Sequence, residues 1–148
     1  KQLSAAQREE LFSLIQRRAL VIGIGIADVE EIDRCNILHA ALMAMRRAVE
    51  AVSLQIDFVL VDGNRLPNLT QPAQAVIRGD SRSLSIAAAS IVAKVTRDRI
   101  MMQWHEQYPQ YDFARHKGYP TRAHIEAIRR YGLSPIHRRS FHPKALNS

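Results

Sequence analysis

Residues 58–61, with the sequence Phe-Val-Leu-Val, form a short apolar run that ends abruptly at Asp62-Gly63-Asn64. Such a run, stopped by turn-forming residues, is typical of a strand buried in the centre of a sheet. A second candidate strand, Ala75 to Ile77, ends in a similar way at Gly79-Asp80. Because helical segments alternate with the strands, we predict an α/β fold in which helices pack on the faces of a sheet.

The helices are marked by capping patterns and by apolar residues at helical spacing. Ser4 to Gln7 has the form of a capping box and begins a helix predicted over 5–18. A second capping pattern at Asp28 begins a helix that extends to about Val52 and breaks near Asn36. Leu20 to Ala27 alternates with period two and predicts a further strand, whose small residues leave one face open to close packing. The remaining segments are predicted as a helix at 85–104, a loop at 108–120 and a helix at 121–131 that Gly132 stops.

The length of 148 residues and the composition, 47% apolar and 24% charged, predict one folded domain. Cys35 is the only cysteine, which excludes an intramolecular disulfide and favours the reducing cytoplasm. The apolar runs at 19–27 and 86–93 are shorter than the ~20 residues that cross a bilayer, and no secretory signal is visible, so no membrane association is expected. No heptad seam is present, and we therefore expect a monomer.

The positive charge is concentrated in the last third of the sequence. Residues 1–96 contain 11 Lys and Arg against 10 Asp and Glu, whereas residues 97–148 contain 10 against 4, in a chain whose formal net charge is +7. A concentrated positive field attracts a polyanion through counterion release, so nucleic acid is the expected partner. A solvated basic surface without a partner is the alternative that composition leaves open.

Two aspartates stand where a metal site could form. Asp62 follows the first apolar run and Asp80 follows the second, so both are expected at the carboxyl ends of strands, where open α/β sheets place their ligands. Mg²⁺ and Mn²⁺ prefer oxygen ligands, and a carboxylate pair in a basic protein suggests metal-assisted phosphoryl chemistry. The alternative is that each aspartate is an ordinary turn residue, since both are next to glycine.

A second candidate site is the stretch from His116 to Thr121, which combines cations, a glycine and an aromatic ring. Lys117 could contact a phosphate and Tyr119 could stack on a sugar or base, as in proteins that bind single strands and RNA. The alternative is a turn with a buried tyrosine that leads into a helix. None of the six histidines, at 39, 105, 116, 124, 137 and 142, has the spacing of a zinc site.

Several of these segments together resemble one family. The resemblance is based on five motifs: Leu60-Val61-Asp62-Gly63-Asn64, Gly79-Asp80-Ser81-Arg82, the run from Ile86 to Asp98, His116 to Thr121, and His137-Arg138-Arg139-Ser140-Phe141. In their order and over almost the whole chain they are similar to the ribonuclease HII family, the type 2 ribonucleases H. The resemblance implies a single RNase H-like domain over 1–148, a mixed sheet flanked by helices, with 107–148 as its basic helical C-terminal part.

The resemblance also implies an activity. The family cuts RNA in RNA–DNA hybrids and incises DNA on the 5′ side of embedded ribonucleotides, by two-metal hydrolysis with Mg²⁺ or Mn²⁺ held by four carboxylates. Asp62 and Asp80 match the third and fourth carboxylates, and Tyr119 matches the tyrosine that senses the 2′-hydroxyl at the RNA–DNA junction. Lys1, Lys94, His116 and Lys117 complete the substrate-binding set that the resemblance predicts.

One part of the family pattern is missing from these 148 residues. The family begins with a strand that carries an Asp-Glu pair and a Gly-Arg-Gly loop, and neither motif occurs here. We therefore expect an N-terminally incomplete ribonuclease H domain that cuts poorly by itself. A non-catalytic nucleic-acid-binding remnant of the same fold is the main alternative, and another RNase H-like nuclease, such as a resolvase, is a more distant one.

Overall fold

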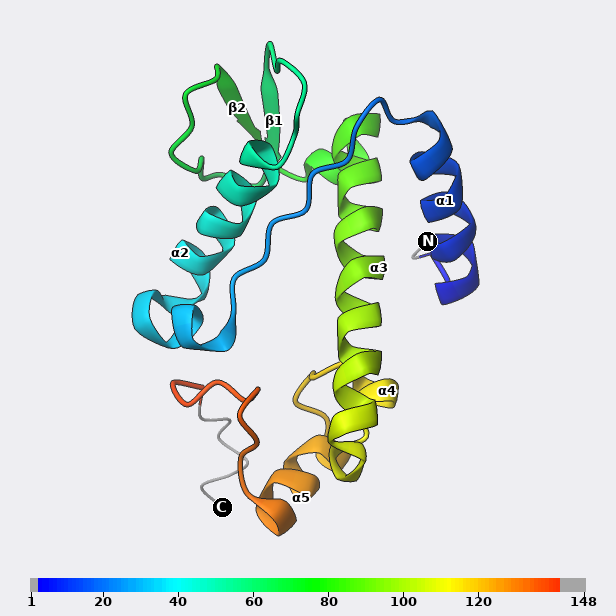
Figure 1. Ribbon diagram of the computed structural model, residues 1–148, viewed down its shortest axis with the longest axis vertical. Helices are drawn as coiled ribbons and strands as arrows, with labels where there is room; N and C mark the ends of the chain where they lie inside the picture. Colours follow the sequence, from blue (N-terminus) through cyan, green and yellow to red (C-terminus); the bar gives the residue numbers. More distant parts are fainter. Residues whose placement is uncertain (1–2, 142–148) are drawn as a thin grey trace. The chain divides into compact units, whose positions relative to one another are not determined.

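The computed structural model describes residues 3–141 (Figure 1). The chain divides into two compact units, Lys1–Val95 and Thr96–Ser148. The boundary falls within helix α3 (Leu84–Gln107). It also coincides with the change in charge along the sequence, because the second unit contains almost the whole positive excess. The interpretation of the chain as one domain stays a prediction. In the described part of the chain, no helix combines the length and the hydrophobicity needed to cross a membrane.

The first unit contains the sheet. Strands β1 (Val59–Asp62) and β2 (Ala73–Val76) pair in parallel, with Val59 opposite Ala73 and Asp62 opposite Val76 (Figure 1). A 3₁₀ helix, η1 (Gly79–Ser81), follows β2 and leads toward α3. The α/β prediction is confirmed, and both strands lie within two residues of the positions expected from the sequence.

The helices of the first unit begin where their capping residues predict. Helix α1 (Ala5–Arg18) has a complete capping box, in which the Ser4 side chain accepts from the Gln7 backbone and the Gln7 side chain accepts from the Ser4 backbone. The reciprocal bonds satisfy two backbone donors that a helix end otherwise leaves open. The helix is held in place by its apolar face, because Phe12 is buried against two residues of α3, Val92 and Val95.

The predicted strand at Leu20 to Ala27 is wrong. This segment has no regular secondary structure and lies against α2 (Val29–Glu50), with Gly23 and Gly25 in direct contact with the helix backbone. A Cβ on Gly25 would overlap the Ala44 carbonyl oxygen and lie 2.5 Å from the Ala48 nitrogen. The expected close packing on the small-residue face is therefore present. Alternation showed which face could pack, but a strand also needs a hydrogen-bonded neighbour, which the segment does not have within residues 3–141.

The close approach of Gly25 to α2 predicts that Gly25→Ala destabilises the protein by about 3 kcal/mol, because the new methyl group would have to displace main-chain atoms. Chemical denaturation followed by far-UV circular dichroism measures this change. Leu20→Ala, in the same segment, is the control, since its side chain is 94% exposed and its loss should cost no more than about 0.5 kcal/mol. Equal stability of Gly25→Ala and the unmodified chain would contradict the packing.

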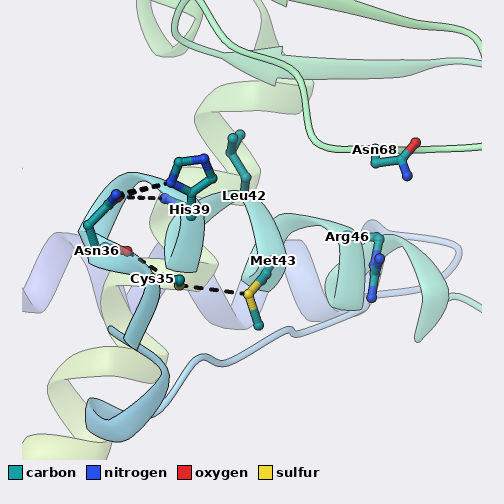
Figure 2. Close-up of a pocket in the computed structure, with 7 residues that line it drawn as sticks. All are labelled: Cys35, Asn36, His39, Leu42, Met43, Arg46 and Asn68. Atoms are coloured by element: carbon teal, nitrogen blue, oxygen red, sulfur yellow. Dashed lines mark hydrogen bonds between the residues drawn. The ribbon is translucent and has the colours of Figure 1, made fainter. Parts of the chain in front are cut away.

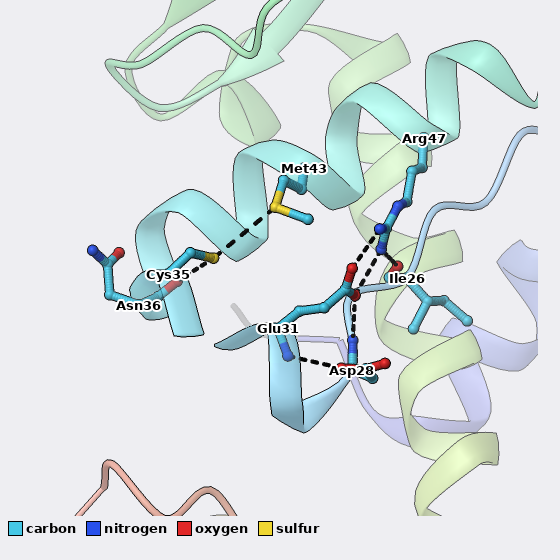
Figure 3. A network of polar contacts seen from close by, with 7 residues as sticks. All are labelled: Ile26, Asp28, Glu31, Cys35, Asn36, Met43 and Arg47. Carbon is cyan, nitrogen blue, oxygen red and sulfur yellow. Dashed lines mark hydrogen bonds and ion pairs between the residues drawn. The ribbon is translucent and has the colours of Figure 1, made fainter. Parts of the chain in front are cut away.

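The break predicted near Asn36 is confirmed and lets α2 fold back on itself. Asn36 has φ 71° and ψ 166°, and its side-chain oxygen accepts from the backbones of Leu38 and His39, so it caps the second half of α2. Two residues on opposite sides of the break, Glu31 and Arg47, form a double ion pair (Figure 3). In a straight helix they would be ~24 Å apart, so this pair requires the break.

The same arginine fixes the segment that enters α2. Arg47 Nη1 donates to the Ile26 carbonyl oxygen at 2.6 Å, while Glu31 completes a capping box with Asp28 at the beginning of the helix (Figure 3). The hydrogen bond from Arg47 lowers the pKa of the Glu31 carboxyl from 4.5 to about 2. One ion pair thus connects both halves of α2 to the extended segment before it.

The second unit is formed by helices and by turns between them. After the end of α3 come the 3₁₀ helix η2 (Pro109–Tyr111), the short helix α4 (Phe113–His116) and α5 (Arg122–Tyr131). Thr121 caps α5 through a side-chain bond to the His124 backbone, and Gly132, at φ 77°, ends it as predicted. The core of this unit contains Tyr111, whose hydroxyl donates to the Gly132 carbonyl oxygen at 2.9 Å.

Candidate active site and nucleic-acid interface

The first unit places Asp62 and Asp80 at the same end of its sheet. Asp62 is the last residue of β1, and Asp80 lies in η1, four residues after Val76 at the end of β2. Asp62 Oδ1 accepts a hydrogen bond from the Gly79 backbone N–H at 2.8 Å. Asp80 directly follows Gly79, so its Cα lies within ~5 Å of the Gly79 nitrogen. The carboxyl-end position predicted for both residues is what the structure shows.

The backbone around Gly79 explains this approach. Arg78 adopts a left-handed conformation, with φ 53° and ψ 44°, which turns the chain directly after β2. Gly79 is buried, and a Cβ at this position would lie 2.5 Å from Ile86 Cδ1 and 3.3 Å from Asp62 Oδ1. A side chain at this position would therefore require the Ile86 side chain of α3 to move.

The aspartate pair has the chemistry of part of a metal site. Both carboxylates are exposed, and within the described residues neither Asp62 Oδ2 nor the Asp80 carboxylate takes part in a hydrogen bond or ion pair. Anionic oxygens available to solvent suit a hard divalent cation. Across residues 3–141, however, no group of three or more His, Cys, Asp or Glu side chains could hold a metal ion. The two aspartates therefore fit as part of the ligand set of a divalent cation, and further ligands would be needed to complete it.

The second candidate site, the loop from His116 to Thr121, is held rigidly by main-chain bonds in the second unit. Tyr119 N–H donates to the His116 carbonyl oxygen at 2.9 Å, and the Tyr119 carbonyl oxygen accepts from Thr121 N–H at 2.8 Å. The Tyr119 ring itself is 54% exposed, and the Arg97 guanidinium lies over it, 5.0 Å from the ring centre. A fixed backbone with an exposed ring can present an aromatic surface to a ligand.

His116 does not have the position predicted for a substrate-binding residue. Its side chain is only 6% exposed, and both ring nitrogens are bonded to the main chain, Nε2 to the Tyr111 carbonyl oxygen and Nδ1 to Gly118 N–H. A ring that is buried and fully bonded has no atom left for a ligand. Lys117 is partly buried, and its Nζ donates to the Ala114 carbonyl oxygen at 2.6 Å, so a phosphate would have to replace this bond.

Lys94 and Lys1 are the two other residues predicted to contact substrate. Lys94 lies on α3, is partly buried and already has an interaction partner. Lys1 lies outside the described residues. The substrate-binding role of both lysines stays a prediction.

The sequence did not indicate the residues that support the Tyr119 loop. His124 Nδ1 bonds to the Tyr119 carbonyl oxygen at 2.9 Å, and His124 Nε2 bonds to His137 Nε2 at 2.9 Å. His137 Nδ1 in turn accepts from Ser134 N–H at 3.0 Å. The Ser-x-x-His spacing at 134–137 is a local signal that could have suggested the last bond. The others connect residues too distant in sequence to be found by spacing.

Burial changes the protonation of these histidines. It lowers the pKa of His124, and the nearby His116 imidazole adds to the effect. It also lowers the pKa of His137, with the neighbouring His124 ring as the second cause, from 6.5 to about 4. Both rings are therefore neutral at pH 7.

One pocket of about 540 Å³ lies elsewhere in the first unit, on the second half of α2 (Figure 2). Its wall includes Asn36 and His39, which are bonded to each other. Neither candidate aspartate lines it. The full set is Cys35, Asn36, His39, Leu42, Met43, Arg46 and Asn68. The pocket therefore adds no residue to the candidate active site.

Comparison with known proteins agrees with the motifs and the fold. The ribonuclease HII family matches residues 1–144. A protein named ribonuclease HII from Marinomonas sp. (strain MWYL1) is 57% identical over 144 residues, which cover 97% of this chain and 72% of the relative. Another of the same name, from Psychromonas ingrahamii (strain DSM 17664 / CCUG 51855 / 37), is 51% identical over 143 residues, covering 97% and 70%. The chain, with its RNase H-like α/β fold, therefore belongs to the ribonuclease HII family of ribonuclease H enzymes.

Proposed function

We propose that this protein is an endonuclease that hydrolyses the RNA strand of RNA–DNA hybrids and incises DNA on the 5′ side of embedded ribonucleotides. The observation that carries the proposal is the juxtaposition of Asp62 and Asp80 through the Gly79 hydrogen bond. This arrangement brings two exposed carboxylates to the end of a parallel strand pair, where α/β proteins bind their ligands. We propose that the protein acts in the cytoplasm and that it is a monomer.

The proposed reaction is two-metal phosphodiester hydrolysis. Asp62, through Oδ2, and Asp80 would hold Mg²⁺ or Mn²⁺. When bound, the cations supply activation of the attacking water and stabilisation of the leaving oxygen. The Gly79 N–H binds Asp62 Oδ1, which leaves the second carboxylate oxygen available to a cation.

The second unit supports substrate binding through its charge. Seven of its arginines are exposed, at positions 97, 99, 115, 122, 129, 130 and 139. Phosphate contacts from such residues give affinity without reading the base sequence. Binding of duplexes should therefore weaken steeply as the salt concentration rises and depend little on sequence.

Tyr119 is proposed to sense the 2′-hydroxyl. Tyr119→Ala is expected to lower the preference for a duplex with one ribonucleotide over an all-DNA duplex by about 10-fold, since a stacking or hydroxyl contact of ~1–2 kcal/mol is lost, while salt-dependent affinity for both remains. Competition binding measures the ratio. Tyr131→Ala is the matched control, because Tyr131 is 48% exposed in the same unit and lies 5.3 Å from the Arg130 guanidinium. An unchanged ratio in Tyr119→Ala would remove this role.

The experiment that tests the proposed function uses an extended chain, in which these 148 residues follow a segment with the family's Asp-Glu and Gly-Arg-Gly motifs. With Mg²⁺ or Mn²⁺, it should cut a hybrid and a DNA duplex with one ribonucleotide, giving 5′-phosphate and 3′-hydroxyl ends, and leave all-DNA duplex intact. Removal of the cations with EDTA should stop both reactions. Cleavage of all-DNA at a similar rate would contradict the proposal.

A non-catalytic nucleic-acid-binding protein is the second candidate function. It is favoured by one observation, that within residues 3–141 no three potential metal ligands come together. This candidate predicts tight, salt-sensitive duplex binding by the extended chain and no cleavage under any metal condition. The same substrate panel therefore separates the two functions.

A further inference from the structure

Three histidines gather beneath the Tyr119 loop. The rings of His116 and His124 are stacked with their centres 4.2 Å apart, and those of His124 and His137 are 5.1 Å apart. Phe113 contacts all three rings edge-on or at an angle. His124 is only 5% exposed, so its ring has almost no access to water. Every polar ring atom in such a place needs a partner within the protein.

The main chain determines which ring nitrogen carries each proton. The Tyr119 carbonyl oxygen can only accept, so the His124 nitrogen 2.9 Å away, Nδ1, carries the proton, and Nε2 of the neutral His124 ring is left to accept. The proton of His137 is then on Nε2, which donates to His124 Nε2 at 2.9 Å. His137 Nδ1 is in turn unprotonated and accepts from Ser134, whose backbone nitrogen lies 3.0 Å and whose hydroxyl oxygen lies 2.7 Å from it. The bonds therefore form a chain with one direction, from Ser134 to Tyr119.

His116 forms hydrogen bonds to the main chain on the N-terminal side of Tyr119, and these bonds fix its tautomer in the same way. Gly118 N–H donates to His116 Nδ1 at 3.2 Å, so Nε2 carries the proton and donates to the Tyr111 carbonyl oxygen at 2.6 Å. Between these contacts and Tyr119, Lys117 has a conformationally costly φ of 50°, while Gly118, at 80°, adopts this region at little cost. A non-glycine residue in this region needs surrounding bonds to keep it there.

We propose that His124 and His137 are positioning residues for substrate recognition, because their directional hydrogen-bond chain fixes the backbone of Tyr119 and so orients its exposed ring. This inference rests on the proposed role of Tyr119. Neither histidine touches the substrate. The chain works only with a neutral His124 ring, because a second proton on His124 would place an N–H group against the Nε2–H of His137. The lowered pKa of His124 agrees with this requirement.

The first test is spectroscopic and needs no activity. In the 148-residue chain with ¹⁵N-labelled histidine, the nitrogen chemical shifts at pH 7 should show a protonated Nδ1 in His124 and a protonated Nε2 in His137 and His116. The Nδ1-protonated form is the unusual signature. A His124 ring protonated on Nε2, or one averaging between both forms, would overturn the proposal.

The second test compares two substitutions at one position in the extended chain. His124→Asn keeps an amide donor near the Nδ1 position, whereas His124→Leu keeps none, and both lose the bond to His137. Both should lower the melting temperature by similar amounts. Only His124→Leu should reduce kcat for the single-ribonucleotide duplex by about 10-fold with little change in KM, as expected for loss of one positioning hydrogen bond. His39→Gln, on the exposed surface of α2, is the histidine control.

The outcomes separate this inference from the proposed function. Equal loss of kcat in His124→Asn and His124→Leu, in proportion to their loss of stability, would show a merely structural role and overturn the inference. If Tyr119→Ala leaves substrate preference unchanged, the proposed role of Tyr119 fails and the positioning role fails with it. The nitrogen shifts would still show in that case whether the hydrogen-bond chain exists.

Discussion

Asp62→Asn in the extended chain is expected to reduce kcat for hybrid cleavage by about 10³-fold or more, because the proposed reaction would lose one of its charged metal ligands. This substitution separates the effect of charge from the effect of structure. The asparagine side-chain oxygen can still accept from Gly79 N–H, so the local fold is retained while the negative charge is removed. Initial rates with a fluorescent hybrid at saturating Mg²⁺ measure the effect.

Asp57→Asn is the matched control for this prediction, since Asp57 is an exposed aspartate two residues before β1. Its rate should stay within about twofold of the unmodified extended chain. If the proposed reaction needs more metal ligands than Asp62 and Asp80, the 148-residue chain by itself should cut hybrids very poorly. Strong incision by this chain, with its mass confirmed, would show that other acids complete the site.

The second unit is expected to lose its packed structure as the pH falls from 6.5 toward 4. The pKa of His137 is about 4 in the folded protein, against about 6.5 in an unfolded chain, so the unfolded state binds more protons in this window. Stability is therefore complete above pH 6.5 and declines as the pH falls through the window. The loss from His137 is on the order of 2 kcal/mol, after allowance for the part of the ring that water still reaches. His124 adds to it in the same direction, and His116 and Tyr111 are the other titratable groups in contact with these rings.

The only tryptophan of the chain allows this transition to be followed in the second unit alone. Trp104 lies on the part of α3 that belongs to this unit, with its ring centre 6.1 Å from that of Tyr108, so its fluorescence and near-UV circular dichroism report local packing. His137→Gln should lower stability at pH 7 but flatten its dependence on pH. Identical Trp104 signals and unfolding midpoints at pH 7 and pH 4.5 would contradict the prediction. The Glu31 ion pair in the first unit titrates separately, since its stabilising effect is lost only as the pH falls from 4.5 toward 2.

Features that depend on neighbouring residues could be predicted from the sequence. The capping residues Ser4 and Asp28, the break at Asn36 and the end of β1 at Asp62 all depend on short-range chemistry, and the structure agrees with each. The family could be predicted too, because several motifs occurred together in one order.

Features that depend on residues distant in the sequence could not be predicted from it. Leu20 to Ala27 has the alternation of a strand, but a ladder requires a second backbone, and this segment packs on α2 instead. His116 was predicted to bind substrate from the family resemblance, whereas the fold turns its ring inward. Its bonds to Tyr111 and Gly118 depend on how α4 and the following turn are arranged, which residue spacing does not encode.

The Gly79 amide offers a direct way to observe ion occupancy without any turnover. Its proton points at one oxygen of Asp62, so its chemical shift depends on the charge carried by that carboxylate. A cation approaching the other oxygen would draw electron density away and weaken the bond, moving the amide resonance in proportion to the fraction bound. Glycine amides resonate in a sparsely populated region of a ¹H–¹⁵N spectrum, and this chain contains only six glycines. One well-resolved peak could therefore report affinities for Mg²⁺ and Ca²⁺ without any measurement of cleavage.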